Sequence, residues 1–532
     1  MPQLRVGGSR RRSKMVEDGT RPRHRYFLIF GLLLLATCRT SGGPATLISN
    51  VTILDGSGGA PFVSSVRIEG DRIVAVGDEA AKDGDVWFID GTGLALAPGF
   101  IDSHSHADGD LQEHRDAIAA VSQGITTVVV GQDGGSPFPL KDFFQQIDST
   151  PPAVNVAAYS GHNTLRAQVM GQDFRREATQ AEVDSMKALL LADFDAGALG
   201  LSTGLEYDPG IFSSRKEVLD LAAAVGPEGG RYISHIRSED RAFWDAIDEI
   251  ITVGREAALP VQISHLKLAM RGLWGRADSL IALLDAARSR GIDITADIYP
   301  YTYWQSTLTV MFPERNFSDR AAAEFALREV AAPEGLLLGR YAPDPSYAGK
   351  TVAQIARQRG RDPASTLMSL IADAEAYRAR TPDAGDVESV IGTSMDEADV
   401  ERLLAWPFAS ISTDGELAGR HPRGYGAFAR VLGVYARERR LFGMAEAVRK
   451  MSALPAHNLG LLDRGGIRPG AAADLVLFDT LAVRDNATTD SPHAPASGIH
   501  MVWVNGEVVY EKGTATGKFP GRAIRRVNVK SE

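Results

Sequence analysis

Four histidines follow short apolar runs that have the composition of β-strands. The first run ends in Asp102-Ser-His104-Ser-His106, and alternate residues of an extended chain face the same side, so both imidazoles can point at one cation. His235 and His265 end two later runs, each directly after an Ile-Ser pair. Imidazole combined with carboxylate suits zinc best among the common divalent metals. The four histidines therefore predict a metal site, with Zn²⁺ as one or two ions.

The elements that must position these side chains are eight short apolar runs, separated by segments of helical character. This alternation is typical of a parallel sheet with crossover helices, and eight units predict an α/β fold, the (β/α)8 TIM barrel. Barrel enzymes carry their chemistry at the carboxyl ends of the strands, where the histidines stand. The runs are Ala97–Asp102, Ile125–Val130, Val154–Tyr159, Ala198–Ser202, Tyr232–His235, Pro260–His265, Asp293–Ile298 and Phe408–Ser412.

Both ends of the folded chain are rich in β-type runs separated by glycine and aspartate turns. Residues 45–97 and 462–532 therefore predict one small composite β domain, with Asn505-Gly506 as a hairpin turn near its end. The barrel is expected over residues 98–461. The long gap between its seventh and eighth strands predicts a helical insertion at about residues 310–400, over the mouth of the barrel.

Residues 1–44 have the pattern of a targeting segment. A basic stretch precedes the apolar run Tyr26–Thr37, which is too short to span a bilayer comfortably, so we expect a signal peptide or lipoprotein leader. Cys38, the only cysteine, closes this run and could carry a lipid anchor, the only membrane attachment that we expect. The mature protein would then be exported, either periplasmic or lipid-anchored at a bacterial cell envelope.

The charge balance excludes nucleic acid as a partner. The whole chain has 57 basic and 67 acidic residues, and removing the nine basic and two acidic residues of positions 1–44 leaves 48 and 65, a balance of −17. Such a body repels phosphate backbones. A small molecule is the expected partner, and a homo-oligomer stays open.

Nine stretches, three of which contain the histidines above, begin at Ala97, Gln123, Gly161, Gly197, Ser234, Ile263, Tyr299, His421 and Ile467. Through them the sequence resembles the amidohydrolase superfamily, and within it the D-aminoacylase (N-acyl-D-amino-acid deacylase) branch. The first histidine pair and the Pro-Gly-Ala-Ala-Ala-Asp part of the last stretch mark the superfamily only, whereas Ser-His-Ile-Arg-Ser-Glu and His-Pro-Arg point to the branch.

The resemblance implies a set of metal ligands: His104, His106, His235 and His265. In the branch a cysteine after strand two completes the set, and this chain has Asp133 at that position, within Gly131-Gln-Asp133-Gly-Gly. A carboxylate can bind or bridge zinc, so Asp133 is the fifth expected ligand. A turn aspartate before Gly134 is the alternative interpretation.

Further roles follow from the same resemblance. Asp414 is similar to the family's catalytic aspartate, which takes a proton from water and returns it to the departing amine, although a second metal ligand or a helix N-cap would also explain it. The expected substrate has a free carboxylate, for which a cationic clamp is needed. The implied substrate-binding residues are Lys267, Tyr299, Arg423, Tyr207 and Ser306, with His162 as a further pocket candidate. A solvated surface arginine is the alternative for Arg423, and packing behind the pocket is the alternative for Tyr207 and His162.

The expected activity is metal-dependent hydrolysis of a C–N amide bond, with N-acyl-D-amino acids as substrates. The segment that begins at Tyr301 is longer and more aromatic than in the branch, so Tyr303 or Trp304 could close the pocket. A D-specific dipeptidase or cyclic amidase on the same scaffold is the close alternative. A catalytically silent binding protein is the alternative from another class.

Overall fold

The computed structural model describes residues 45–81, 86–382 and 385–526. The predicted leader, with Cys38, lies outside the described residues, as do the last six residues of the predicted tail. Within the described ranges, no helix combines the length and apolar character that a membrane crossing needs. The predicted domain boundaries stay predictions.

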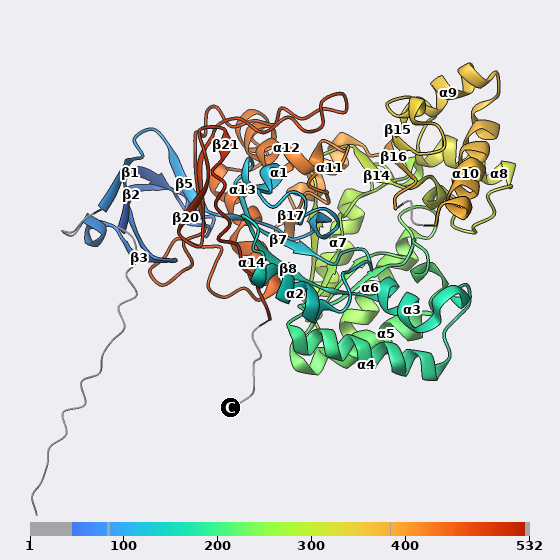
Figure 1. Ribbon diagram of the computed structural model, residues 1–532, viewed down its shortest axis with the longest axis horizontal. Helices are drawn as coiled ribbons and strands as arrows, with labels where there is room; N and C mark the ends of the chain where they lie inside the picture. The colour runs from blue at the N-terminus through green and yellow to red at the C-terminus, as the bar shows by residue number, and fades with distance from the viewer. Residues whose placement is uncertain (1–44, 82–85, 383–384, 527–532) are drawn as a thin grey trace, which may run out of the picture. The chain divides into compact units, whose positions relative to one another are not determined.

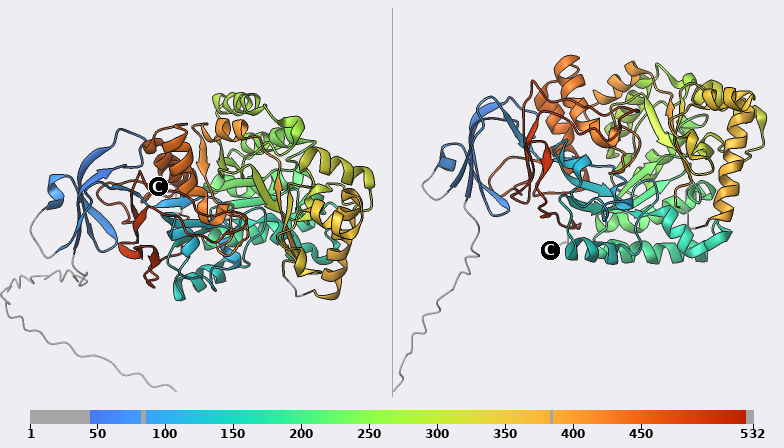
Figure 2. Two further views of the ribbon diagram at one scale, coloured as in Figure 1. Left: turned by 90° about the horizontal axis from the view of Figure 1, so that it is seen from above. Right: turned by 45° about the horizontal axis from the view of Figure 1, so that its top comes forward.

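One nine-stranded sheet joins strands from both ends of the chain, seen as blue beside red in Figures 1 and 2. The joint is an antiparallel pairing of β5 with β18, in which Ala97 lies opposite Val476. Asn505 and Gly506, both with positive φ, form the predicted turn between β19 and β20. The strands are β1 (Ala45–Ile53), β2 (Phe62–Glu69), β3 (Arg72–Val76), β4 (Val86–Asp90), β5 (Ala95–Pro98), β18 (Leu475–Phe478), β19 (Ile499–Val504), β20 (Glu507–Glu511) and β21 (Thr514–Ala515).

The middle of the chain forms two parallel sheets, in the orders β6-β7-β8 and β17-β13-β12-β11-β10-β9. Almost every residue in them is buried, as expected for strands covered on both faces. Only Tyr159 separates β8 from β9 along the chain. The strands are β6 (Phe100–Asp102), β7 (Ile125–Val130), β8 (Asn155–Ala158), β9 (Ser160–Gly161), β10 (Gly200–Gly204), β11 (Arg231–His235), β12 (Val261–Ile263), β13 (Ile294–Ile298) and β17 (Ala409–Ile411).

Helices separate these strands along the chain and pack outside them (Figure 1). The apolar faces of such helices bury against the strands, as Ile247 and Ile250 of α6 do. The helices are α1 (Ile118–Val121), α2 (Leu140–Ser149), α3 (His162–Met170), α4 (Gln180–Ala196), α5 (Arg215–Val225), α6 (Phe243–Glu256), α7 (Ala277–Ser289), α11 (Glu397–Leu404), α12 (Arg423–Arg430), α13 (Met444–Met451) and α14 (Ala453–Leu459).

The first and last parallel strands are linked just beyond their carboxyl ends. His106 N donates to Gly415 O at 3.0 Å, and Asp414 N donates to His104 O at 2.9 Å. These two bonds join the segment after β6 to the segment after β17. The backbone therefore brings His104 and His106 next to Asp414.

The first predicted strand is divided between two sheets. Residues up to Pro98 belong to β5 in the nine-stranded sheet, and the parallel strand β6 begins at Phe100. Gly99 lies at the change of sheet, where a Cβ atom would stand 2.3 Å from the Thr126 hydroxyl. The single run predicted from Ala97 was therefore wrong in its start, because apolarity does not show which sheet a residue joins.

The insertion between β13 and β17 is not purely helical, which corrects that prediction. It contains the antiparallel sheet β14-β16-β15 in addition to its helices. The strands are short and glycine interrupts the apolar residues of β15 and β16, so their strand pattern in the sequence is weak. The elements are β14 (Tyr303–Ser306), α8 (Arg320–Phe325), β15 (Leu336–Tyr341), α9 (Val352–Arg359), α10 (Pro363–Arg380) and β16 (Glu388–Thr393).

Glu388, at the start of β16, makes the stability of the insertion pH-dependent. It is buried, and both of its carboxylate oxygens accept a hydrogen bond from Leu308 N at 3.1 Å. Burial raises the pKa of Glu388 from 4.5 to about 7. The unfolded chain therefore loses this proton at lower pH than the folded chain, and stability falls as the pH rises from 4.5 to 7.

We expect Glu388→Gln to remove that loss, since the amide keeps an acceptor for Leu308 N and does not ionise. Melting temperatures of both proteins at pH 4.5 and pH 8 check this. The wild type should lose several degrees relative to the variant on going to pH 8. An equal change in the two proteins would show that Glu388 does not hold a proton in the folded state.

Candidate metal centre

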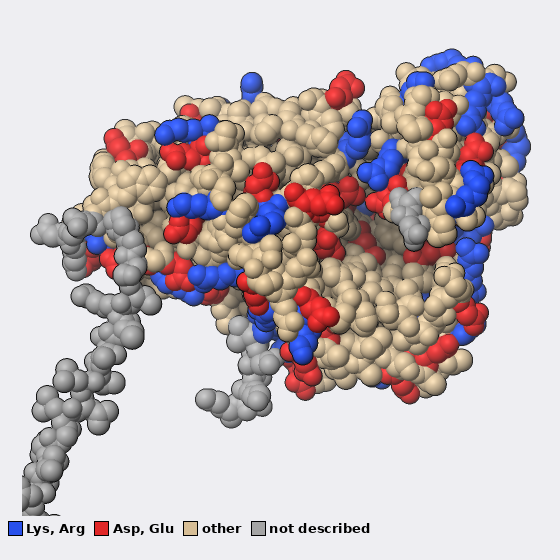
Figure 3. Space-filling model, in the orientation of Figure 1, with Lys and Arg blue, Asp and Glu red and all other residues tan. Residues whose placement is uncertain are grey.

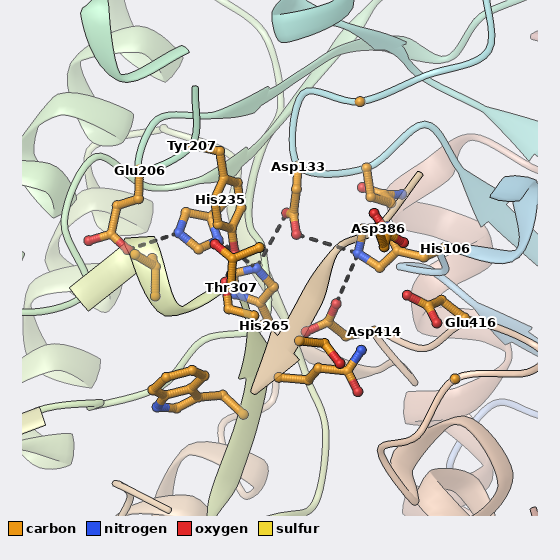
Figure 4. A pocket seen from close by; sticks show the side chains of 18 of the residues that line it. His106, Asp133, Glu206, Tyr207, His235, His265, Thr307, Asp386, Asp414 and Glu416 are labelled. Atoms are coloured by element: carbon orange, nitrogen blue, oxygen red, sulfur yellow. Dashed lines mark hydrogen bonds and ion pairs between the residues drawn. The ribbon is translucent and has the colours of Figure 1, made fainter. Parts of the chain in front are cut away.

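A cavity of about 760 Å³ opens where the carboxyl ends of the parallel strands face the insertion. Figure 3 shows a hollow in this region, with acidic side chains in and around it. Ten of the eleven residues that the sequence singled out for the metal, the catalysis and the substrate line the cavity, and Figure 4 shows several of them converging. The ten are His106, Asp133, Tyr207, His235, His265, Lys267, Tyr299, Ser306, Asp414 and Arg423.

One group of ligand atoms comes from the ends of β6, β7 and β17. His106 Nε2 lies 3.1 Å from Asp414 Oδ1 and 3.5 Å from Asp133 Oδ2. His104 Nε2 lies 3.5 Å from the Oδ1 atoms of both Asp133 and Asp414, and its ring is fully buried. These four side chains offer their ligand atoms within 4.8 Å of one another.

A second group shares Asp133 with the first. His265 Nε2 lies 3.3 Å from Asp133 Oδ1 and 3.0 Å from His235 Nδ1. Asp133 therefore belongs to both groups of potential ligands, and Figure 4 shows its carboxylate between His106 and His265.

Asp133 owes its position to a tight turn after β7. Gly131, Asp133 and Gly134 all have positive φ, which is uncommon for an aspartate. A Cβ on Gly134 would meet Asn163 Oδ1 at 2.5 Å and a Cβ on Gly131 would meet Tyr159 O at 2.2 Å. Gly134 therefore lets the turn pack closely against α3, and Gly131 lets it pack against Tyr159, between β8 and β9.

The residues present fit a bound cation. Both ring nitrogens of His104 and Oδ1 of Asp133 are buried, yet none has a hydrogen-bond partner among the described residues. Such atoms are costly unless something else satisfies them. Two ligands of a tetrahedral zinc, each about 2.1 Å from the ion, lie about 3.4 Å apart, close to the spacings of 3.0–3.5 Å found in both groups.

The two aspartates of the centre are anionic. Burial alone would raise the pKa of Asp133, but the imidazoles of His104 and His265 hold it well below its usual value. Burial likewise opposes ionisation of Asp414, and the Arg423 guanidinium and His265 overcome it, so its pKa is lowered too. Two carboxylates with at least four imidazoles nearby make a donor set of the kind that zinc takes.

Three further polar side chains line the cavity, those of Arg423, Lys267 and Tyr299. Arg423 Nη1 lies 2.5 Å from Asp414 Oδ2, and its guanidinium covers the Tyr299 ring at 4.7 Å from the centroid. Lys267 Nζ is paired with Glu239 Oε1 at 2.5 Å. The hydroxyl of Tyr299 is buried and has no partner in the described chain. These groups form a cationic wall next to the candidate metal ligands.

The remaining wall combines aromatic and small polar side chains. Ser306 Oγ donates to Tyr207 OH across a 3.5 Å gap, and Trp304 lines the cavity with its Nε1 bonded to Ser394 Oγ. Tyr303 instead packs against His421. For His162 the structure supports the packing interpretation: it begins α3, is fully buried with its Nε2 2.8 Å from Glu217 Oε1, and does not line the cavity.

The model of the amidohydrolase family matches residues 88–510, which cover both parallel sheets, the insertion and the part of the nine-stranded sheet that contains β5, β18 and β19. The chain belongs to the amidohydrolase family. This amidohydrolase is 35% identical over 512 residues to D-aminoacylase of Alcaligenes xylosoxydans xylosoxydans, covering 90% of this chain and 97% of the relative. It is 36% identical to N-acyl-D-aspartate deacylase of the same organism, covering 90% and 94%.

Two solved structures match the amidohydrolase with a TM-score of 0.80. One describes the functional role of the binuclear metal centre in D-aminoacylase, at 36% identity over 90% of this chain and 99% of that one. The other is N-acyl-D-glutamate deacylase of Bordetella bronchiseptica complexed with zinc and a phosphonate inhibitor that mimics the tetrahedral intermediate, at 33% identity over 91% and 100%. The branch predicted from the sequence is therefore confirmed.

Two glutamates of the amidohydrolase contact the ring nitrogens of His235 and His265 that point away from each other, and neither glutamate was predicted to have a role. Glu206 Oε2 lies 3.1 Å from His235 Nε2, and Glu239 Oε1 lies 3.1 Å from His265 Nδ1. A histidine that binds metal through one nitrogen is commonly oriented by a carboxylate at the other. Glu239 ends the Ser-His-Ile-Arg-Ser-Glu stretch, so its position in that motif was the available signal.

We expect Glu239→Gln to weaken metal binding about 10- to 100-fold, because the amide no longer neutralises Lys267 beside His265. Titration of the metal-free amidohydrolase with zinc, in the presence of a competing chelator, measures this. Glu239→Asp, which keeps the charge, should recover part of the affinity. Unchanged zinc affinity in the glutamine variant would remove Glu239 from the support of the centre.

Asp297 lies beneath the centre, near the carboxyl end of β13. It is fully buried and accepts hydrogen bonds from His265 N, Ser412 Oγ and Gln262 Nε2 at 2.8–2.9 Å. Its Oδ1 also lies 3.5 Å from His104 Nδ1. Asp297 therefore fixes the ends of β12, β13 and β17 relative to one another. The only signal for this role in the sequence is an aspartate inside an apolar run.

Proposed function

We propose that this amidohydrolase deacylates N-acyl-D-amino acids with zinc, held as one or two ions. The observation that carries the proposal is a set of ligand atoms sharing Asp133, open to a cavity whose next wall is cationic. The deacylase activities named for its relatives support the same reaction.

His104, His106, Asp133, His235 and His265 would hold the metal, with Asp414 at its edge. When bound, zinc lowers the pKa of a water ligand and polarises a scissile carbonyl. A carboxylate is then needed to accept the proton of the attacking water. Asp414 is anionic and faces the ligand atoms, so we assign it that role, with return of the proton to the leaving amine.

Arg423, Lys267 and Tyr299 would bind the carboxylate of the amino acid. A guanidinium can donate two parallel hydrogen bonds to a carboxylate, and Arg423 is buried beside Asp414, close to where the scissile bond must lie. The Tyr299 hydroxyl, without a partner in the described residues, supplies another donor. Tyr207 and Ser306 would then face the side chain or the acyl group.

We further propose a closed barrel, a composite β domain and export from the cytoplasm. The backbone bonds between the ends of β6 and β17 support a closed (β/α)8 barrel, and the pairing of β5 with β18 supports a composite β domain. The basic and apolar composition of residues 1–44 supports export to the periplasm or a lipid anchor at Cys38.

The test is a set of parallel assays on zinc-loaded full-length protein. N-acetyl-D-amino acids, their L-enantiomers, D-containing dipeptides and hydantoins would each be offered under the same conditions. We expect release of acetate from the D-enantiomers, with much slower turnover of the L-enantiomers. Turnover of dipeptides or hydantoins alone would replace this proposal by the dipeptidase or the cyclic amidase.

A further inference from the structure

His421 opens the His-Pro-Arg stretch, yet it does not line the cavity. It is 3% exposed. Its Nδ1 accepts a hydrogen bond from Arg423 N at 3.0 Å, and its Nε2 lies 3.0 Å from Tyr303 O. Because a carbonyl oxygen only accepts, Nε2 must be the protonated nitrogen, and Nδ1 must keep its lone pair for the backbone N–H. The two bonds therefore require one neutral tautomer.

The surroundings of the ring match this neutral form. Three tyrosine rings pack around it, with centroids 6.2 Å (Tyr299), 5.4 Å (Tyr301) and 4.8 Å (Tyr303) away. Burial and the nearby Arg423 guanidinium both lower the pKa of His421 well below its usual value. The imidazole is therefore a fixed, uncharged connector between two segments.

The segments that it connects form two walls of the cavity. On one side, Arg423 is the first residue of α12, and its guanidinium reaches Asp414. On the other side, Tyr303 begins β14, which carries Trp304 and Ser306 into the cavity. Along the chain, Tyr303 and His421 are more than one hundred residues apart, so the hydrogen bonds of His421 join segments that are distant in the sequence.

We infer that His421 is a positioning residue for substrate recognition: it sets the Arg423 guanidinium at a fixed distance from the aromatic wall that begins at Tyr303. The inference rests on the proposed function, since it assumes that Arg423 binds the carboxylate of an N-acyl-D-amino acid. A misplacement of about 1 Å in such a clamp can cost about 100-fold in rate. His421 would thus control how strongly the enzyme prefers a substrate with a free carboxylate.

The test compares N-acetyl-D-leucine with its carboxamide, N-acetyl-D-leucinamide, on the zinc-loaded enzyme. His421→Asn keeps an acceptor near Arg423 N but cannot reach Tyr303 O, and His421→Gln offers a longer amide that can. We expect His421→Asn to lower kcat/KM for the acid about 10- to 100-fold and that for the amide less than threefold. His421→Gln should recover part of the loss on the acid.

Tyr301→Phe is the matched control, because it keeps the ring against His421 and removes only a buried hydroxyl without a partner in the described chain. It should leave both substrates within twofold of wild type. Equal losses on the acid and the amide in His421→Asn, or no loss on either, would overturn the inference. If His421→Asn fails to fold, His421→Gln is used in its place. A larger loss of kcat/KM on the acid than on the amide would then support the inference, and equal losses or no loss would overturn it. Wild-type enzyme inactive on both substrates would instead contradict the proposed function.

Discussion

Asp414→Asn is expected to lower kcat by about 100- to 10,000-fold while zinc stays bound. The amide keeps the size of the carboxylate but cannot accept a proton from water or return it to the amine. The other ligand atoms, including His235 and His265 with Asp133, do not depend on Asp414. Steady-state kinetics on N-acetyl-D-amino acids, together with the zinc content of the same preparation, measure both parts of this result.

Asp485→Asn is the control for this variant. Asp485 is also paired with an arginine, Arg430, at 3.3 Å, but it does not line the cavity. We expect its kcat to stay within a few-fold of wild type. Full turnover in Asp414→Asn would exclude the carboxylate from proton transfer, and loss of zinc in that variant would make Asp414 chiefly a ligand.

Replacement of Asp133 by alanine is expected to abolish zinc binding in a protein that still folds. Asp133→Ala removes the one carboxylate that faces both groups of histidines, so zinc and activity should fall together, with activity reduced by several orders of magnitude. Asp133→Cys should keep zinc, because a thiolate is among its preferred ligands. Metal analysis after dialysis, with activity on the same samples, compares the three proteins.

Thermal unfolding supplies an independent measurement on these variants. A ligand that binds only the folded state stabilises it by about 2.7 kcal/mol at 100 times its Kd, so zinc should raise the melting temperature of the wild type and of Asp133→Cys. The melting temperature of Asp133→Ala should respond much less. An equal response in all three would show that Asp133 is a turn residue and not a ligand.

The sequence predicted well those features that depend on local pattern. His104 and His106 stand two apart at a strand end, and strand geometry alone places them on one side. The range predicted for β7 agrees with the structure because Ile125–Val130 is apolar throughout and ends at Gly131. The parallel strands, their order along the chain and the joining of both ends in one sheet all follow from such signals.

Features that depend on long-range packing could not be predicted in this way. Glu206, Glu239 and Asp297 look like ordinary acidic residues, and their roles arise only when neighbouring strands bring them to His235, His265 and His104. The choice of Asp133 as a ligand came from the resemblance, since its own segment also fits a simple turn. The position of His162 behind the turn depends on how α3 packs.

A cation is expected to bind between the Asp133 carboxylate and two histidines, His235 at the end of β11 and His265 just after β12. Diffraction from crystals of the zinc-loaded enzyme, measured on both sides of the zinc absorption edge, would locate it. We expect an anomalous peak within about 2.0–2.2 Å of Asp133, His235 and His265, with a second peak at His104 and His106 if two ions bind. Zinc-replete crystals without a peak beside Asp133 would contradict it.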